Sequence, residues 1–189
     1  MRKAFVVLSV CFLLIIIAIV FAKSYLFVTQ KSQRPAIRKE GSMKIASNAF
    51  GDNQMIPVKF TCSGEDINPP LLFENVPKDA KSLVLIVDDP DAPLGTFVHW
   101  VVYNMAPTLK GIGENMKPEG IEGKNGAGKN AYMGPCPPSG THHYHFKLYA
   151  LDSMLDFTDP AAVDKKAVEE KMQGHILEQA ELVGLYSKQ

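Results

Sequence analysis

No excess of either charge marks this sequence, because 20 lysines and arginines balance 20 aspartates and glutamates among 189 residues. This balance argues against a nucleic-acid surface and against a polybasic patch for anionic membranes. Internal repeats and low-complexity tracts are also missing after Met43. Since single domains run about 100–200 residues, the chain is expected to hold one domain plus an appendage.

Metal-binding and hydrolase motifs are missing as well. The five histidines and three cysteines form no HxxxH or CxxC pair, so we expect no metal site and no cofactor. A nucleophile elbow of the GxSxG type surrounds neither Ser139 nor Cys136. A hydrolase that uses one of them beside His142 is therefore only a minority alternative.

The N-terminus carries the one long apolar run. Residues 4–22 have no charge and follow Arg2 and Lys3. Such a run over residues 1–22 is a signal peptide or a transmembrane anchor, and its length beyond about 15 residues favours an uncleaved anchor. We expect a linker over 23–42 and a folded domain over 43–189. The domain is then membrane-anchored or secreted, on the periplasmic or other extracytoplasmic side.

Two cysteines lie outside this run, at Cys62 and Cys136. In an exported domain such a pair is compatible with one disulfide. Two buried thiols are the alternative, since sequence spacing does not give the Cα separation that a bridge requires. Both interpretations stay open.

Short apolar segments between turn residues predict a mainly β fold. The predicted strands are 44–47, 57–61, 71–74, 82–88, 97–105 and 143–151. Residues 83–87 and 98–105 are apolar at nearly every position, so both faces of these strands are expected to be covered. Irregular connections between the strands predict an antiparallel Greek-key β-sandwich. The Gly-, Lys- and Asn-rich stretch 111–130 is expected to be a loop.

One helix is predicted near the C-terminus. Asp159 and Pro160 are typical of an N-cap and a first turn. Apolar residues then recur at four-residue spacing, at Val168, Met172, Ile176 and Ala180. This stripe predicts a helix over 161–180, followed by a short strand over 182–187.

The first segment whose side chains are suited to binding or catalysis is Asp88-Asp89-Pro90-Asp91, at the end of an apolar strand. Asp and Pro favour turns, which is a sufficient explanation of the segment alone. By period two, however, Asp89 shares a face with Leu85 and Val87, where a carboxylate is costly unless it is paired. His99 lies in the next apolar strand, where a lone histidine is usually a satisfied core residue. If Asp89 approaches it, the pairing favours a protonated imidazole that can hold an anion.

The second segment is the Gly/Pro-rich loop 132–141 and the strand that follows it. Proline removes backbone donors and glycine tolerates unusual φ, so this segment is expected to be a fixed loop and not regular structure. On the strand, His142 and Tyr144 share a face with Phe146, while His143 and His145 point the other way. His142 and Tyr144 are therefore the polar groups aimed inward.

Three separated motifs, DPDAP at 89–93, HWVVYN at 99–104 and GPCPPSGTHHY at 134–144, occur in this order. Together they resemble the phosphatidylethanolamine-binding protein family, in particular its bacterial Raf-kinase-inhibitor-like branch. Segments 60–71 and 174–188 resemble the same branch, so the resemblance covers about residues 43–188. It implies a β-sandwich with peripheral helices and a small pocket for phosphate or carboxylate groups.

The resemblance also implies roles for individual residues. Those expected to line the pocket are Asp89, His99, His142 and Tyr144. Pro93, Gly134 and Pro135 are expected to shape its rim, with backbone N–H groups around Gly134 completing an anion nest. Asp91 is expected to stabilise the loop or to contact ligand. Phe97 is expected to form a wall at a position where many relatives have Trp.

The expected function is binding or regulation through a small anionic ligand, phosphate or phosphoethanolamine-like, without turnover. The alternative is a protein-interaction module of the protease- or kinase-inhibitor type that has no physiological small ligand. The membrane is expected as a partner only through the N-terminal segment.

Overall fold

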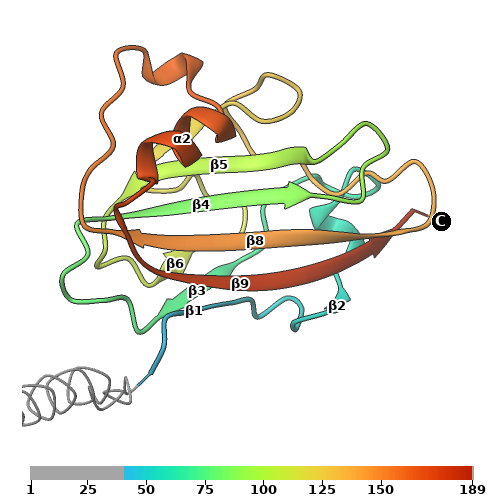
Figure 1. Ribbon diagram of the computed structural model, residues 1–189. Helices are drawn as coiled ribbons and strands as arrows, with labels where there is room; N and C mark the ends of the chain where they lie inside the picture. Colours follow the sequence, from blue (N-terminus) through green and yellow to red (C-terminus); the bar gives the residue numbers. More distant parts are fainter. Residues whose placement is uncertain (1–40, 189) are drawn as a thin grey trace, which may run out of the picture. The chain divides into compact units, whose positions relative to one another are not determined.

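The computed structural model describes residues 41–188, which form two β-sheets packed face to face with one helix outside the larger sheet (Figure 1). The predicted signal peptide or anchor, and all of the predicted linker except residues 41 and 42, lie outside the described residues. Within 41–188, no helix is long and apolar enough to cross a membrane.

The larger sheet has six strands in the order β2-β9-β8-β4-β5-β7. Their bounds are β2 Gln54–Met55, β9 Ile176–Ser187, β8 Thr141–Leu151, β4 Ser82–Asp89, β5 Phe97–Met105 and β7 Ile121–Gly123. Neighbouring strands are antiparallel except β2 and β9, which pair in parallel. β4 and β8 lie in the middle of the sheet.

The smaller sheet is antiparallel and has the order β1-β3-β6. Its strands are β1 Lys44–Ala46, β3 Leu71–Glu74 and β6 Gly111–Ile112. The prediction of a mainly β, two-sheet fold is therefore confirmed. β6 and β7 both fall in the stretch 111–130, so the prediction of a loop throughout this stretch is wrong.

Two apolar cores explain why β4 is buried at every position. Leu85 faces the core between the sheets, where it joins side chains such as Phe146. Ile86 faces the opposite core, which the larger sheet forms with Val168 and Met172 of the helix. Because successive side chains of a strand point to opposite faces, a strand between two cores is apolar throughout.

The helix is shorter than predicted, so the helix expected over 161–180 is wrong. Asp159 caps only a 3₁₀ turn, η2 (Pro160–Ala162), and Asp164 then caps α2 (Lys165–Met172) by accepting a hydrogen bond from the Ala167 N–H. The chain leaves the helix through Gly174, whose φ of +80° favours glycine. Beyond it, β9 pairs with β8 along nearly its whole length, and this pairing overrides the helical spacing of Ile176 and Ala180.

The strand predicted over 57–61 is also wrong, because this segment forms a 3₁₀ turn, η1 (Val58–Phe60). The backbone N–H and the hydroxyl of Thr61 both donate to the carbonyl oxygen of Val58, at 3.0 and 2.8 Å. Such bonds close a turn and leave Phe60 buried in the core. Val58 and Phe60 have the two-residue spacing of a strand, although the segment is a turn.

A buried carboxylate attaches α2 to the larger sheet. Asp88 is 1% exposed, and its oxygens accept hydrogen bonds from Nζ of Lys147 on β8 and form an ion pair with Nζ of Lys165 on α2, each at 2.8 Å. A buried charge is tolerated only when it is paired. Asp88 therefore holds helix and sheet together on the outer face.

We predict that Asp88→Asn lowers the free energy of unfolding by about 1–3 kcal/mol, because charged hydrogen bonds to two lysines are lost. Lys165→Met should cost less, since Lys147 still compensates the carboxylate. Urea unfolding measures both variants. Lys166→Met is the control, because Lys166 is 82% exposed and its ion pair with Glu170, at 3.8 Å, is long. Equal costs for Asp88→Asn and Lys166→Met would contradict the role of Asp88.

Candidate functional site

A pocket of about 300 Å³ lies where β4 ends and where β5 and β8 begin. Two segments that are distant in sequence, 89–99 and 133–142, contribute its walls. The lining residues are Asp89, Ala92, Pro93, Phe97, His99, Met133, Cys136, Pro138 and His142. Five of the residues expected at the site, Asp89, Pro93, Phe97, His99 and His142, thus lie around one concavity.

A β-bulge brings His99 to this face of the sheet. The pairing of β4 with β5 shifts between Val87 and Asp88, so that Val87 lies opposite Trp100 and Asp88 opposite Val98. Trp100 packs in the core between the sheets although His99, its neighbour, lines the pocket on the same side. The bulge therefore lets two successive side chains share one face, as bulges beside functional sites commonly do.

His142 and Asp89 form a buried pair in the pocket. Nδ1 of His142 lies 2.7 Å from Oδ2 of Asp89, and the two side chains are only 8% and 5% exposed. The other carboxylate oxygen, Oδ1, accepts a hydrogen bond from the backbone N–H of Asp91 at 2.9 Å. Both oxygens of Asp89 thus have fixed partners, and its carboxylate orients the imidazole.

His99 has a different partner from the one expected. Its Nδ1 lies 2.7 Å from the carbonyl oxygen of Met133, and the Met133 N–H donates to the His99 carbonyl at 3.0 Å. Burial lowers the pKa of His99 below its usual range, although the Met133 carbonyl and the charge of Asp89 act in the opposite direction. The hydrogen-bond partner of His99 is therefore Met133, whereas Asp89, the partner expected from the sequence, is bound to His142. Sequence reasoning missed Met133, because its backbone carbonyl makes the contact and every residue type has a backbone carbonyl.

Tyr144 lies beneath the pocket, outside its lining. Its side chain is fully buried, with ring centroids 5.1 Å from His99 and 6.5 Å from His142. Burial, and secondarily the charge of Asp89, raises the pKa of Tyr144 well above its usual range. Tyr144 therefore supports both imidazole rings from the core as a neutral phenol.

Gly134 and Pro135 also lie outside the lining. The Gly134 N–H donates to Oδ1 of Asp66 at 2.6 Å, and the Pro135 carbonyl accepts from the Cys62 N–H at 3.1 Å. A Cβ at Gly134 would lie 2.6 Å from the Phe60 carbonyl oxygen, so only glycine fits this close approach. The expected anion nest at Gly134 is therefore wrong, since Asp66 already takes the N–H group.

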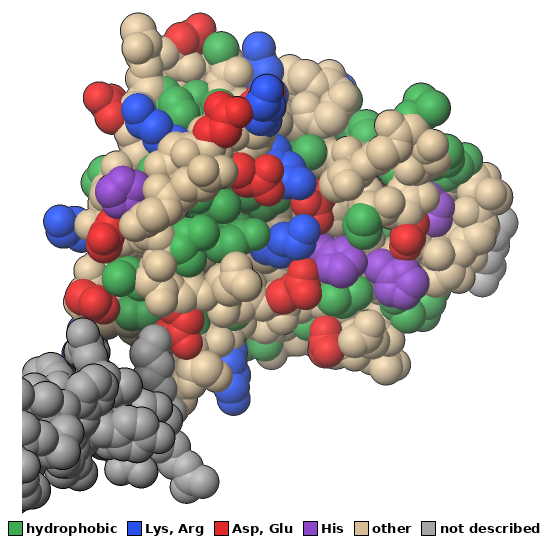
Figure 2. Space-filling model, in the orientation of Figure 1, with side chains coloured by type: hydrophobic (Ala, Val, Ile, Leu, Met, Phe, Trp, Pro, Cys, Tyr) green, Lys and Arg blue, Asp and Glu red, His purple; other side chains and the backbone are tan. Residues whose placement is uncertain are grey.

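Asp91 stabilises the loop between β4 and β5. Its Oδ2 accepts hydrogen bonds from Nδ1 and from the backbone N–H of His143, at 2.7 and 2.9 Å. These bonds, the side-chain one first, lower the pKa of Asp91. His143 belongs to the outer face of the larger sheet, where Figure 2 shows histidine side chains next to acidic ones. Asp91 thus ties the loop to β8 on the side away from the pocket.

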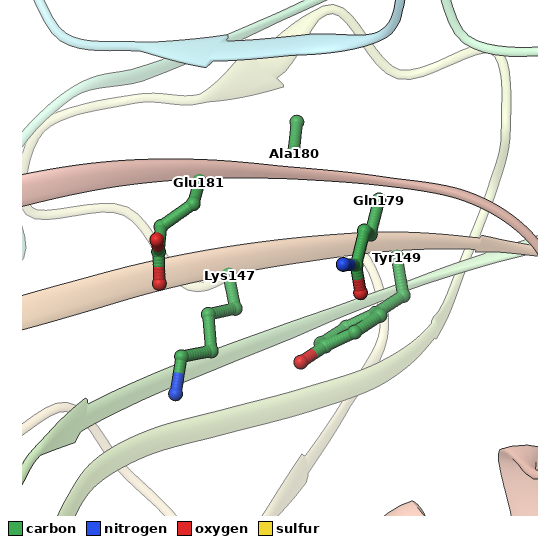
Figure 3. A pocket seen from close by; sticks show the side chains of 5 residues that line it. All are labelled: Lys147, Tyr149, Gln179, Ala180 and Glu181. Atoms are coloured by element: carbon green, nitrogen blue, oxygen red, sulfur yellow. The ribbon is translucent and has the colours of Figure 1, made fainter.

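A second hollow of about 240 Å³ lies on the outer face of β8 and β9. Figure 3 shows the side chains of Lys147, Tyr149, Gln179 and Glu181 on one side of the strands and Ala180 on the other. Lys147 is already bound to Asp88, and none of the residues predicted for the site lies here. The candidate site is therefore the pocket at the end of β4.

Cys136 forms a disulfide with Cys62, with Cα atoms 5.4 Å apart. A sulfur in a disulfide is no nucleophile, so the hydrolase alternative loses one of its two candidates. Within the described part of the chain, Ser139 makes no hydrogen bond to a histidine, and no group of three or more His, Cys, Asp or Glu residues is arranged to hold a metal ion.

Comparison with known proteins identifies the family of this chain. The family model of the phosphatidylethanolamine-binding protein matches residues 46–187. The UPF0098 protein of Methanothermobacter thermautotrophicus is 48% identical over 152 residues, which cover 77% of this chain and 99% of that protein. A UPF0098 protein of Pyrococcus horikoshii is 48% identical over 157 residues, or 78% of this chain and 77% of the relative.

Solved structures agree with the sequence relatives. The crystal structure of a phosphatidylethanolamine-binding protein homologue from Chlamydia trachomatis has a TM-score of 0.75 and 43% identity, and the match covers 78% of this chain and 99% of that one. Escherichia coli YbcL, described as a member of the mammalian family, has a TM-score of 0.73 and 26% identity over 79% of this chain and all of that chain. The chain therefore belongs to the phosphatidylethanolamine-binding protein family.

Proposed function

We propose that this protein binds a small ligand through an anionic group, phosphate or carboxylate, and acts as a binding or regulatory protein. The observation that carries the proposal is the buried pair of His142 and Asp89 beside His99 in one pocket. An oriented imidazole is a hydrogen-bond donor suited to an oxyanion, and this pocket contains two of them, His99 and His142.

The hydrogen-bond partners determine which ring atoms can meet a ligand. A carbonyl oxygen only accepts, so Nδ1 of His99 carries its hydrogen towards Met133. Nδ1 of His142 likewise donates to the carboxylate of Asp89. Nε2 is therefore the ring atom that each histidine can offer. To donate to an anion, Nε2 needs a second proton, which makes the imidazole cationic.

The rest of the pocket wall is mainly apolar, with Pro93, Phe97, Met133 and Pro138 among its residues. Such walls exclude water and strengthen the hydrogen bonds formed inside them. They also account for the low pKa of His99, because desolvation opposes its charge. A bound anion reverses this balance by supplying the missing negative charge.

We place the domain on the extracytoplasmic side of a membrane, attached or released through the apolar segment 4–22. The disulfide between Cys62 and Cys136 supports this location, since disulfides persist mainly in oxidising compartments. N-terminal sequencing of the natural protein distinguishes a chain that begins at Met1 from one cleaved near Ala22.

A protein partner is the second candidate, and one side chain favours it. Leu94 is fully exposed at the tip of the loop that follows Pro93 at the pocket wall. Under this alternative, capture of a partner from envelope extracts survives His142→Ala and is lost with Leu94→Ser.

We predict that His142→Gln weakens binding of phosphate and phosphoethanolamine at least tenfold, because a charged hydrogen bond contributes about 1.5–3 kcal/mol. Titration followed by the imidazole resonances measures the affinity. His175→Gln is the matched control, since His175 pairs with Asp152 on the surface and lies outside the pocket lining. Equal affinity for the two variants, or no shift of the His99 and His142 resonances, contradicts the proposed ligand.

Anion binding should strengthen as the pH falls. Burial lowers the pKa of His99 and so favours its neutral ring, and an anion bound at Nε2 should therefore bring a proton with it. Sulfate is the suitable probe, since its own charge is constant between about pH 8 and pH 5.5, where histidine titrates. We expect its affinity to rise through this range and to rise less in His99→Gln. A pH-independent affinity in the unmodified protein contradicts this mechanism.

A further inference from the structure

The disulfide lies in the wall of the candidate site. Cys136 is exposed and lines the pocket, whereas Cys62 is half-buried and lies outside the lining. The bond therefore joins a pocket residue to the segment that follows η1. Its position places the exposed residue of the disulfide at the pocket.

Three hydrogen bonds hold the loop before Cys136 to the same segment. The hydroxyl of Tyr132 donates to the Phe60 carbonyl at 2.9 Å. The Gly134 N–H donates to Asp66, and the Cys62 N–H donates to the Pro135 carbonyl. All three bonds use residues 132–135 of the loop.

After Cys136 the loop has no such support. Within the described part of the chain, residues 137–140 make no hydrogen bond before β8 begins at Thr141. Pro138 nevertheless forms part of the pocket wall, and Ser139 and Gly140 are exposed. Pro137 is buried, so packing at this residue and the covalent disulfide at Cys136 are what hold this part of the wall.

We propose that Cys62–Cys136 is a thiol–disulfide exchange site, and that its oxidation state sets how firmly the pocket wall is held. Reduction removes the covalent tie at residue 136 and gives the exposed residues 138–140 more freedom, without disturbing the strands. The wall formed by Cys136 and Pro138 then loosens, and the pocket binds its anion more weakly. The last step rests on the proposed function, whereas the loosening of the loop does not.

The chemistry needs a dithiol as reductant. Its thiolate attacks Sγ of the exposed Cys136, the bond between the two sulfurs breaks, and the electron pair leaves with Sγ of Cys62, which takes up a proton. The second thiol then attacks the reductant's sulfur in the mixed disulfide and releases Cys136 as a thiol. Overall, two electrons and two protons pass to the protein, and the dithiol becomes a disulfide.

Ligand and oxidation state are then linked in both directions. If the oxidised pocket binds the anion more tightly, the anion must favour the oxidised protein by the same factor. A saturating ligand therefore slows or opposes reduction. A disulfide that only stabilises the fold shows no such dependence on ligand.

The test uses the full chain with Cys11→Ser, which removes the third cysteine. Oxidised protein, protein reduced with dithiothreitol and the double variant Cys62→Ser/Cys136→Ser are compared without ligand. We expect amide exchange at Ser139 and Gly140 to rise about tenfold on reduction, as in local opening, with β4 and β8 unchanged. The His99 resonances should shift, because His99 lines the same pocket as Cys136 and Pro138.

Sulfate titration of the same samples tests the effect on binding, and we expect an affinity about fivefold or more lower after reduction, which is the lower end of typical coupling between sites. Single variants test the site of attack: Cys136 in Cys62→Ser should form a mixed disulfide with oxidised glutathione faster than Cys62 in Cys136→Ser. The sulfate affinity of the double variant should be the same with and without the reductant.

Unchanged exchange and unchanged His99 resonances after complete reduction overturn the proposal, as does equal sulfate affinity in both oxidation states. Loop loosening in a protein that binds sulfate in neither state has a different meaning. That result supports the exchange site and overturns the proposed ligand. The two proposals can therefore fail separately.

Discussion

Two consecutive aspartates at the end of β4 are the constraint on which the surroundings of this strand depend. Asp88 and Asp89 are both almost fully buried, and a buried carboxylate is stable only when it is paired. Because side chains alternate along a strand, Asp88 meets lysines on the outer face while Asp89 meets His142 on the inner one. One strand end thus fixes helix α2 on one side of the sheet and the pocket on the other.

The pocket itself consists of side chains placed by neighbouring structure. The bulge in β5 turns His99 inward beside Trp100, and Met133 fixes the tautomer of its ring. Tyr144 supports both imidazoles from below, while the disulfide and Asp66 hold the loop that closes one side. Met133 and Cys136 form part of the pocket wall, whereas Tyr144 and Asp66 act from outside its lining.

Burial and charge act against each other at His99. Burial lowers its pKa, because desolvation disfavours a buried unpaired cation. In the function we propose, the ring becomes cationic when a bound anion compensates its charge. Proton uptake, ligand binding and the position of the loop therefore belong to one coupled system in the function we propose.

The sequence by itself determined the two-sheet fold and the strands 71–74 and 97–105, because turn residues and apolar runs are local signals. It also placed Asp89 and His142 on inward faces, since period two is a property of the chain. Only the tertiary structure decided that Asp89 pairs with His142 and not with His99. Likewise, Ile176 and Ala180 fit a helical stripe equally well, but pairing with β8 made them a strand. Bulges, backbone partners and long-range pairing depend on neighbours distant in sequence, and no local pattern encodes them.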